Sequence, residues 1–487
     1  MEGYVVIIVW AILLVLITPL LRAIILRHKV NGESVPLSAP YKVTDLKRGV
    51  ENLAKAVSFA TVSYQEWEKT DLEVFRGFRE FLKESYPLTF SKLTVLDAGE
   101  LNILLYWEGE NTTLLPALLM AHQDVVDAQD AKDWTYPPFA STVEQGYVWG
   151  RGSFDAKAQL IAIMESLEML LAAHKRPQRS YYIAFGCDEE IRGSNGAQKI
   201  AQFFVAQNIR FAFVLDEGGV VADAFISALK EPVAVVGVAE KSNTNIVMTL
   251  AKEGGHSSNP QNPSAVALLS RAIWRLEKRK FKGELTQPIR ELLTILGLNA
   301  PFLLSIPLLN LWLFKPLVAA IFSKNPATDA LLRSTCAVTM VKGSSAANVI
   351  ANKSEAVANV RLLPNRNQEV ALKMVKRRVK NRAINYQLVQ HAPPSRISST
   401  ESAEFSLIKE TINRVFPEAL VSPYLMAGGT DAIWFEALCD NVFRFTPALM
   451  DSGELKRMHG KNERFSLANL ERAISFYATL ITQGSHH

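Results

Sequence analysis

The sequence is short of cysteine and of net charge, and both shortages exclude classes of protein. Three cysteines, Cys187, Cys336 and Cys439, lie far apart in 487 residues and form no C-x-x-C pair, so neither a disulfide scaffold nor a thiolate metal site is indicated. A formal net charge of +5 is too small for this length to predict nucleic-acid binding. The densest basic run, residues 373–382, has the spacing of a solvated helix face. With 48% hydrophobic residues the chain is globular, and its length favours two domains over one.

A long apolar run stands at the N-terminus. Residues 4–26 are broken only by Pro19 and Arg22, and the run suits the thickness of a bilayer core. No basic segment precedes it and no small-x-small cleavage pattern follows it, as a cleaved signal peptide would require. We therefore expect residues 1–29 to form an uncleaved, single-pass membrane anchor.

The flanks of this anchor leave its orientation open. Cations on its C-terminal side favour a cytosolic main domain. The sequons at Asn111 and Asn352 would carry glycans only if that domain faced a secretory lumen. Residues 30–45 are polar and are interpreted as a linker, and residues 484–487 as the remnant of an expression tag.

Beyond the linker, two hydrophobic patterns alternate along the chain. Apolar residues recur at intervals of three and four, as in helices, in residues 50–62 and 72–86. Short apolar runs bounded by turns predict buried strands in residues 101–109, 114–122, 180–190 and 211–219. Helices between such strands are typical of an α/β fold with a mixed, largely parallel sheet. In such folds ligands gather at the carboxyl ends of the strands.

Side chains that bind metals stand at these predicted strand ends. Alone, each is usually an ordinary solvated residue, but their repetition at successive strands predicts a site. The candidates are His122, Asp124, Asp155, Glu189, Glu190, Asp216 and, far downstream in another loop, His459.

The charges of this set suit two divalent cations. Three carboxylates, Asp155, Glu190 and Asp216, with His122 and His459 as neutral ligands, leave one of four positive charges for a bridging hydroxide. Imidazole and carboxylate ligands predict zinc, with manganese or cobalt as alternatives. Such a metal pair activates a water molecule and polarises a substrate carbonyl.

The remaining acids are assigned by their neighbours. Asp155 is the expected bridge between the metals, whereas Asp124 is expected to accept the second ring N–H of His122 without touching metal. Of the two adjacent glutamates, we expect Glu190 to bind metal, while Glu189 points the other way and acts as general base.

Several short motifs, taken in order, resemble a known family. They are "AHQDVVD", "GRGSFDAKA", "CDEE" followed by "GSNGA", "LDEGG", "GGHSSNP", "GGTDA" and "MHGKNER". Together they look like the M20 family of dinuclear zinc peptidases and aminoacylases, and most like its carboxypeptidase S and PM20D1 branch, which cleaves or forms N-acyl amino acids. The resemblance spans about residues 45 to 480. It implies two ligand sets that share one carboxylate, namely His122, Asp155 and Asp216 on one metal and Asp155, Glu190 and His459 on the other, with Glu189 as base.

The resemblance also implies a lid domain inserted into the metal-binding domain. The lid would occupy residues 240–391, and the zinc domain residues 46–239 and 392–483. Within the lid, His256 matches the histidine that stabilises the oxyanion, in the same subunit or from a dimer partner. A homodimer formed through the lid is therefore one expectation.

Substrate-binding positions follow from the same resemblance. Asn348 matches a residue that holds the substrate carbonyl, and Arg361 one that binds its free carboxylate, for which a guanidinium fork is suited. The backbone at Gly428 and Gly429 would approach the same group closely, because glycine has no side chain to block it. Where the family commonly has proline after "NVI", this chain has Ala351, which leaves the loop of Asn348 less rigid.

One segment is unusual for a lid. Residues 291–322 are almost entirely apolar, yet three prolines and Lys315 break the run, which argues against a second membrane span. Two or three short helices with one buried face would fit. They would pack against the lid or a partner subunit, or they would line a channel for a long acyl chain or rest on the bilayer.

These observations predict a metal-dependent hydrolase of N-acyl amino acids, with long fatty acyl chains, that runs in both directions. A carboxypeptidase or dipeptidase acting on short peptides would use the same metal ligands. In a different class, the chain would be a membrane-anchored binding protein that keeps the fold without catalysis.

Overall fold

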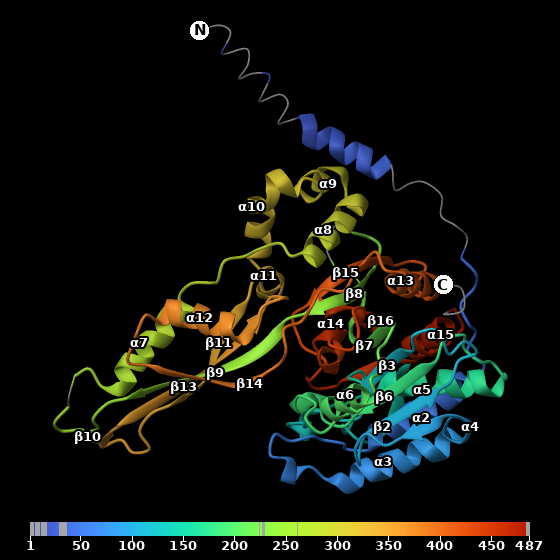
Figure 1. Ribbon diagram of the computed structural model, residues 1–487, viewed down its shortest axis with the longest axis horizontal. Coiled ribbons are helices and arrows are strands. Elements are labelled where there is room, and N and C mark those ends of the chain that lie inside the picture. Colours follow the sequence, from blue (N-terminus) through green and yellow to red (C-terminus); the bar gives the residue numbers. More distant parts are fainter. Residues whose placement is uncertain are drawn as a thin grey trace.

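The computed structural model describes most of the chain (Figure 1). The described residues are Tyr4, Trp10, 17–28, 37–223, 225, 229–260 and 262–483. Residues 17–28 form a helix, but most of the expected anchor and of the linker, and all of the expected tag remnant, lie outside the described residues. Within the described part, no single helix has the length and apolarity to cross a membrane.

The larger domain is built on a mixed sheet of eight strands. Across the sheet these are β1 (Thr94–Leu96), β2 (Ile103–Trp107), β6 (Tyr181–Gly186), β3 (Ala117–His122), β7 (Phe213–Ala222), β16 (Val442–Met450), β8 (Val233–Glu240) and β15 (Leu420–Met426). Strands β6, β3, β7 and β16 run parallel to one another, and β8 runs parallel to β15. The pairs β1–β2, β2–β6, β16–β8 and β7–β8 are antiparallel. The α/β fold with a mixed, largely parallel sheet is thus confirmed.

Helices cover both faces of this sheet. Every residue of β3 and β6 is buried, which explains why these strands are apolar throughout rather than alternating. One face carries α2 (Leu46–Ser58), α5 (Lys157–Ala172), α13 (Ala403–Val415) and α15 (Leu467–Gln483). The other carries α6 (Ala197–Ala206) and the 3₁₀ helix η4 (Asp431–Phe435). The remaining helices of this domain are α3 (Leu72–Ser85), α4 (Pro87–Lys92), α14 (Ser452–Leu455), η1 (Trp67–Lys69), η2 (Ala131–Asp133) and η3 (Glu189–Ile191).

A second sheet lies in the segment predicted to be the lid. Its order is β11 (Thr335–Lys342), β13 (Lys353–Leu362), β9 (Ser242–Ala251) and β14 (Asn385–His391), all antiparallel. Alternate residues of β9 and β13 are buried beneath α7 (Ala265–Glu277) and α12 (Gln368–Val379), so this sheet has one apolar face. The chain enters after Glu240 and returns by Ser395, and the two crossings are adjacent, because the Glu240 N–H donates to the Ser395 hydroxyl at 3.1 Å.

The apolar insertion forms three short helices, as its prolines predict. These are α8 (Gln287–Asn299), α9 (Phe302–Leu309) and α10 (Leu311–Phe322), followed by α11 (Pro326–Leu332). Helix α8 is buried against β8 and β15, whereas Leu309 and Val318 are the only buried apolar side chains of α9 and α10, both of which the structure describes throughout. Helices α9 and α10 meet at 107° and together pass a length and hydropathy test for a broken membrane span.

Candidate metal centre and substrate pocket

The predicted strand ends meet at one pocket of about 950 Å³. His122 is the last residue of β3, and Glu189 and Glu190 begin η3 directly after β6. Asp155 precedes α5, and His459 reaches the same place from the loop between α14 and β17 (Arg464–Ser466). Strand β17 is fixed there by a small sheet with β5 (Tyr147–Trp149) and β4 (Thr142–Glu144). The fold therefore gathers side chains that are more than 300 residues apart in sequence, since His122 and His459 both contact Asp155.

The geometry puts Asp155 between the two imidazoles. Its Oδ1 lies 3.0 Å from His122 Nε2, and its Oδ2 lies 2.9 Å from His459 Nε2. His459 Nε2 is also 3.1 Å from Glu190 Oε1. A carboxylate that offers one oxygen to each of two ligand sets is the arrangement that a bridging metal ligand needs.

Glu217, not Asp216, completes the cluster. Both oxygens of Asp216 accept backbone N–H groups, from Glu217 at 2.9 Å and from Ala432 at 2.8 Å. Glu217 Oε1 instead lies 3.3 Å from His122 Nε2, and its ligand atom falls within 4.8 Å of those of His122 and Glu189. The structure thus does not bring Asp216 to the position predicted for it.

A β-bulge explains this exchange of neighbours. Strand β7 pairs Asp216 with Arg444 and then Gly219 with Phe445, so Glu217 and Gly218 are the extra residues of a bulge. Gly218 adopts φ 137°, a conformation open to glycine, and the bulge aims Glu217 into the pocket. The sequence did not predict Glu217 as a residue of the site. Alternation along a strand shows only that adjacent side chains face opposite ways, and it does not show which of the two faces the site.

Asp124 contacts His122, Glu189 and Glu190 and fixes their relative positions. Its carboxylate accepts the N–H groups of Glu189 at 3.0 Å and Glu190 at 3.1 Å, and the hydroxyl of Ser63 at 2.6 Å. His122 Nδ1 lies 2.9 Å from the backbone carbonyl oxygen of Asp124 and 3.4 Å from the carboxylate. The main-chain carbonyl of Asp124 therefore orients the ring, and its side chain positions η3.

We call the side of the pocket that carries Asp155, Glu189, Glu190 and Glu217 the metal wall. Burial and mutual repulsion dominate its electrostatics. Burial, together with the charge of Glu217, raises the pKa of Glu189 well above its ordinary value, although His122 opposes the shift. Burial and Asp155 raise the pKa of Glu217 to about 8. Hydrogen bonds that His459 donates to Asp155 and Glu190 raise its pKa to about 10. So many buried carboxylates whose partners are imidazoles have the charge and donor chemistry of a site for divalent cations.

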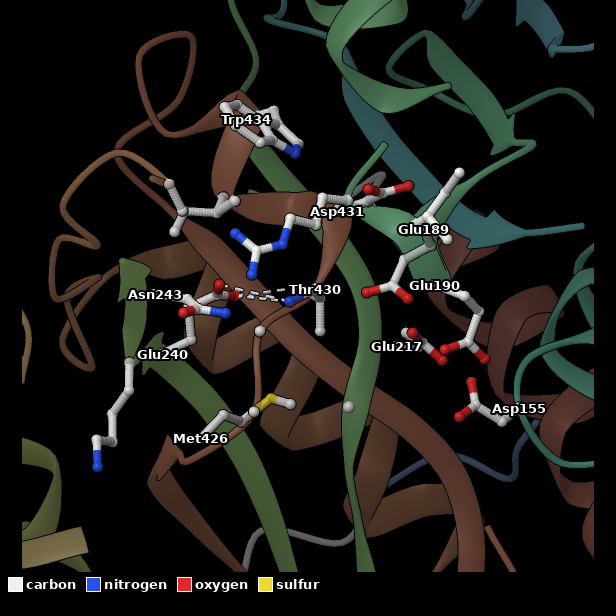
Figure 2. Close-up of a pocket in the computed structure, with 18 of the residues that line it drawn as sticks. Asp155, Glu189, Glu190, Glu217, Glu240, Asn243, Met426, Thr430, Asp431 and Trp434 are labelled. Carbon is white, nitrogen blue, oxygen red and sulfur yellow. Dashed lines mark hydrogen bonds between the residues drawn. The ribbon is translucent and has the colours of Figure 1, made fainter. Parts of the chain in front are cut away.

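The opposite side of the pocket, which we call the hinge wall, is formed by Glu240 at the end of β8 and by residues of β9 and β13 in the second sheet. Figure 2 shows Asp155, Glu189, Glu190 and Glu217 on one side of the pocket, and Glu240 and Asn243 across from them. Arg361 also lines the pocket and donates to the Ala427 carbonyl oxygen at 3.4 Å, beside the glycine turn. Gly428 and Gly429, whose backbone was predicted to approach the substrate, both line the pocket. Nothing lies within 4 Å of the position that a Cβ of Gly428 would occupy.

A buried ion-pair network supports this glycine turn. Glu240 accepts the Thr430 N–H and hydroxyl and lies 2.6 Å from Arg444 Nε. Arg444, which has no exposed side-chain surface, also donates to Glu436 at 3.0 Å. Burial raises the pKa of Glu240, and the guanidinium of Arg444 opposes that shift.

Two of the predicted residues, His256 and Asn348, lie away from the metal cluster. His256 is exposed on the two-residue strand β10 (Gly255–His256), where it pairs with β12 (Val349–Ile350), and its Nδ1 contacts the Ser258 hydroxyl at 2.7 Å. Asn348 lies beside it and accepts the Ser257 N–H through its carbonyl at 3.0 Å. Neither lines the pocket, and both make their contacts with neighbours around this pair of strands, so within one subunit the structure does not bring them to the metal cluster.

Comparison with known proteins decides the family. The profile described as peptidase family M20/M25/M40 matches residues 118–483. The chain belongs to peptidase family M20.

Relatives agree with this assignment over nearly the whole chain. Probable carboxypeptidase S-like 2 of Dictyostelium discoideum is 35% identical, over 88% of this chain and 84% of its own. The N-fatty-acyl-amino acid synthase/hydrolase PM20D1 of Xenopus tropicalis is 35% identical over 89% and 85%.

Solved structures give the same fold. The M20 family metallo-carboxypeptidase Sso-CP2 from Sulfolobus solfataricus superposes with a TM-score of 0.65 at 17% identity, covering 89% of this chain and 98% of the other. The M20 chain is therefore an enzyme of the metal-dependent hydrolase type, and it carries residue groups that can hold metal ions.

Proposed function

We propose that this M20 enzyme hydrolyses, and in reverse forms, the amide bond of N-acyl amino acids with long fatty acyl chains. The observation that carries this choice is the 35% identity over 89% of the chain to the Xenopus tropicalis N-fatty-acyl-amino acid synthase/hydrolase. The equal identity to a carboxypeptidase S-like protein makes cleavage of short peptides the second candidate.

We infer that two cations, zinc in our proposal, are held at the metal wall. His122, Asp155 and Glu217 would hold one, with Glu217 in place of Asp216, and Asp155, Glu190 and His459 the other. When bound, such ions supply Lewis acidity to the amide carbonyl and lower the pKa of a water molecule.

Glu189 is proposed to move the proton. Its raised pKa suits a group that takes a proton from water and then gives it to the leaving amine nitrogen. Its backbone is fixed by Asp124, so the carboxylate keeps one place relative to His122. Arg361, on the opposite wall, is proposed to bind the free carboxylate of the amino acid.

We further propose that His256 and Asn348 act from a second copy of the chain. Both lie on the β10–β12 hairpin of the lid, outside the pocket of their own subunit, so a lid-mediated homodimer would be needed to present them. The single-pass anchor of residues 1–29, with its side of the membrane open, stays a prediction from the sequence.

A substrate panel tests the function. The purified enzyme, with and without added zinc, is given N-acetyl and N-oleoyl amino acids and short dipeptides, and release of free amino acid is measured. We expect N-oleoyl amino acids to be cleaved most efficiently and chelation to abolish the reaction. Preference for the dipeptides would replace this proposal with the carboxypeptidase.

A further inference from the structure

The helix over residues 17–28 packs against the apolar insertion, almost 300 residues away in sequence. Asn310, at the bend between α9 and α10, donates through Nδ2 to the Pro19 carbonyl oxygen at 2.9 Å. Arg27 donates to the Ala300 carbonyl oxygen and to the Ser305 hydroxyl. Pro19 and Ala23 are buried on this side of the helix. The two segments therefore form one unit, which Figure 1 places at the end of the molecule opposite α3.

The other side of this unit is apolar and exposed. Leu303 is 80% exposed, Trp312 57% and Leu317 51%, values opposite to what soluble helices show for such side chains. The full set is Ile17, Leu20, Leu21, Ile24, Ile25, Phe302, Leu303, Leu304, Trp312, Leu317 and Ile321. We call these eleven residues the apolar face. So many exposed apolar side chains on one packed unit indicate a binding site rather than ordinary surface.

Charge on this unit has one sign. Residues 17–28 and 300–324 contain no aspartate or glutamate. Their exposed cations are Arg22, Lys315 and Lys324. Tryptophan together with cations beside an apolar face is the composition of helices that lie in the interface of an anionic bilayer.

The apolar sequence before residue 17 favours a bilayer over a protein partner as the occupant of the apolar face. Residues 11–16 read "AILLVL" and lead directly into Ile17, so the longest apolar run of the sequence ends on the apolar face. An apolar segment that continues into a face suited to the bilayer surface fits one lipid occupant for both.

The unit is also tied firmly to the substrate pocket. Leu292 and Leu296 of α8 share one buried cluster with Val235 of β8 and Leu425 of β15. Strand β15 ends at Met426, directly before the glycine turn that lines the pocket. Contact at the apolar face would therefore hold the pocket at a set position relative to the lipid.

We propose that the helix over residues 17–28, α9 and α10 form a docking surface that lies in the interface of an anionic phospholipid bilayer. This surface goes beyond the proposed function and does not depend on which amide is cleaved. It differs from a membrane anchor, because it sets the orientation of the folded domain as well as its attachment.

Site-directed fluorescence on the full chain tests the proposal. Leu303→Cys and Leu317→Cys are each labelled with an environment-sensitive nitrobenzoxadiazole probe, and Val205→Cys, on the exposed side of α6, is the matched control. Cys187 and Cys439 are buried and Cys336 partly so, and labelling of the unsubstituted chain gives the background. The proteins are mixed with phosphatidylcholine vesicles, with or without phosphatidylserine, that contain brominated lipid.

We expect brominated lipid to quench the probes at positions 303 and 317, but not at 205, and more strongly with phosphatidylserine present. Vesicles that leave positions 303 and 317 unquenched would overturn the proposal, whether or not the chain sediments with them. Equal quenching in both lipid mixtures would overturn the assignment to anionic membranes. A probe response that needs no lipid and grows with protein concentration would assign the face to self-association instead.

A binding measurement gives an independent arm. Leu303→Glu/Leu317→Glu should lower vesicle affinity about tenfold, because charged side chains then enter the interface. The exposed pair Val95→Glu/Val205→Glu should leave it unchanged. Thermal unfolding of both double variants checks that the fold is kept, and equal affinities of the two would contradict the proposal.

Discussion

The two walls of the pocket both bury carboxylates, but they neutralise them differently. At the hinge wall, Glu240 and Glu436 share the guanidinium of Arg444 at 2.6 and 3.0 Å. At the metal wall, the partners of Asp155, Glu190 and Glu217 are the imidazoles of His122 and His459. A buried charge is tolerated only when it is paired, so the hinge wall is complete within the chain, whereas the metal wall calls for cations from outside.

The largest expected effect comes from the base on the metal wall. Glu189→Gln should lower kcat by about 10²–10⁴-fold, the range typical of general base catalysis, because glutamine cannot accept the proton. Metal content, measured by atomic emission, should stay near wild type, while Asp155→Ala should lose metal as well. Substantial remaining activity in Glu189→Gln would refute the role assigned to Glu189.

Next in size is the loss of the cation on the hinge wall. Arg444→Met leaves Glu240 and Glu436 buried without their partner, which should reduce the free energy of unfolding by about 3–5 kcal/mol. The control is Arg472→Met, which breaks the exposed pair with Glu418 and should cost about 0–1 kcal/mol. Urea unfolding of both variants measures the difference. If the two cost the same, the hinge wall would not depend on its internal cation.

A smaller effect, on metal affinity, should distinguish Glu217 from Asp216, the two adjacent acids of β7. Glu217→Ala should weaken metal binding by more than about 100-fold, since losing a ligand exceeds the 10–100-fold typical of groups behind the ligands. Asp216→Asn should keep both metals, because that side chain holds backbone N–H groups. Metal titration of each variant decides, and the reverse ranking would restore Asp216 as the ligand.

The smallest effect is on pH dependence. Without metal, Glu217 has a pKa of about 8 and His459 one of about 10, so both carry protons at neutral pH. These protons must leave when a cation binds, so apparent zinc affinity should rise by about a hundredfold per pH unit below about 8 and by about tenfold per unit from about 8 to 10. Isothermal titration in buffers of different ionisation enthalpy counts the protons.

The raised pKa of Glu217 also determines how the stability of the metal-free protein changes with pH. Because the pKa of Glu217 is raised in the folded, metal-free protein, the folded state binds more protons than the unfolded state between about pH 4.5 and 8. The contribution of this group to stability is therefore full at low pH and is lost as pH rises through about 8. The melting temperature of Glu217→Gln should fall less over this range, and parallel curves would contradict the assignment.

The sequence predicted the α/β fold and the place of the site, because strand ends and ligand types are local properties. His122, Asp155, Glu189, Glu190 and His459 all line or contact one cluster. It did not predict Glu217, since a bulge is set by pairing with β16 and has no local signature beyond two glycines.

The sequence was limited in the same way for the segment predicted to be the lid. Motif resemblance selected His256 and Asn348, but their distance from the pocket depends on the path of a long insertion. The ion pairs of Arg444 join β16 to the end of β8 and to Glu436, and sequence spacing alone does not relate these segments.

The chain passes between the two sheets at Glu240 and Ser395, which lie side by side. If the second sheet turned about this junction, Arg361 would move while the metal wall stayed in place, since the first belongs to β13 and the second to the sheet of the larger domain. The angle of that rotation would set the span between the guanidinium and the cations. Such a rotation would thereby select substrates by the number of bonds between their free carboxylate and their amide.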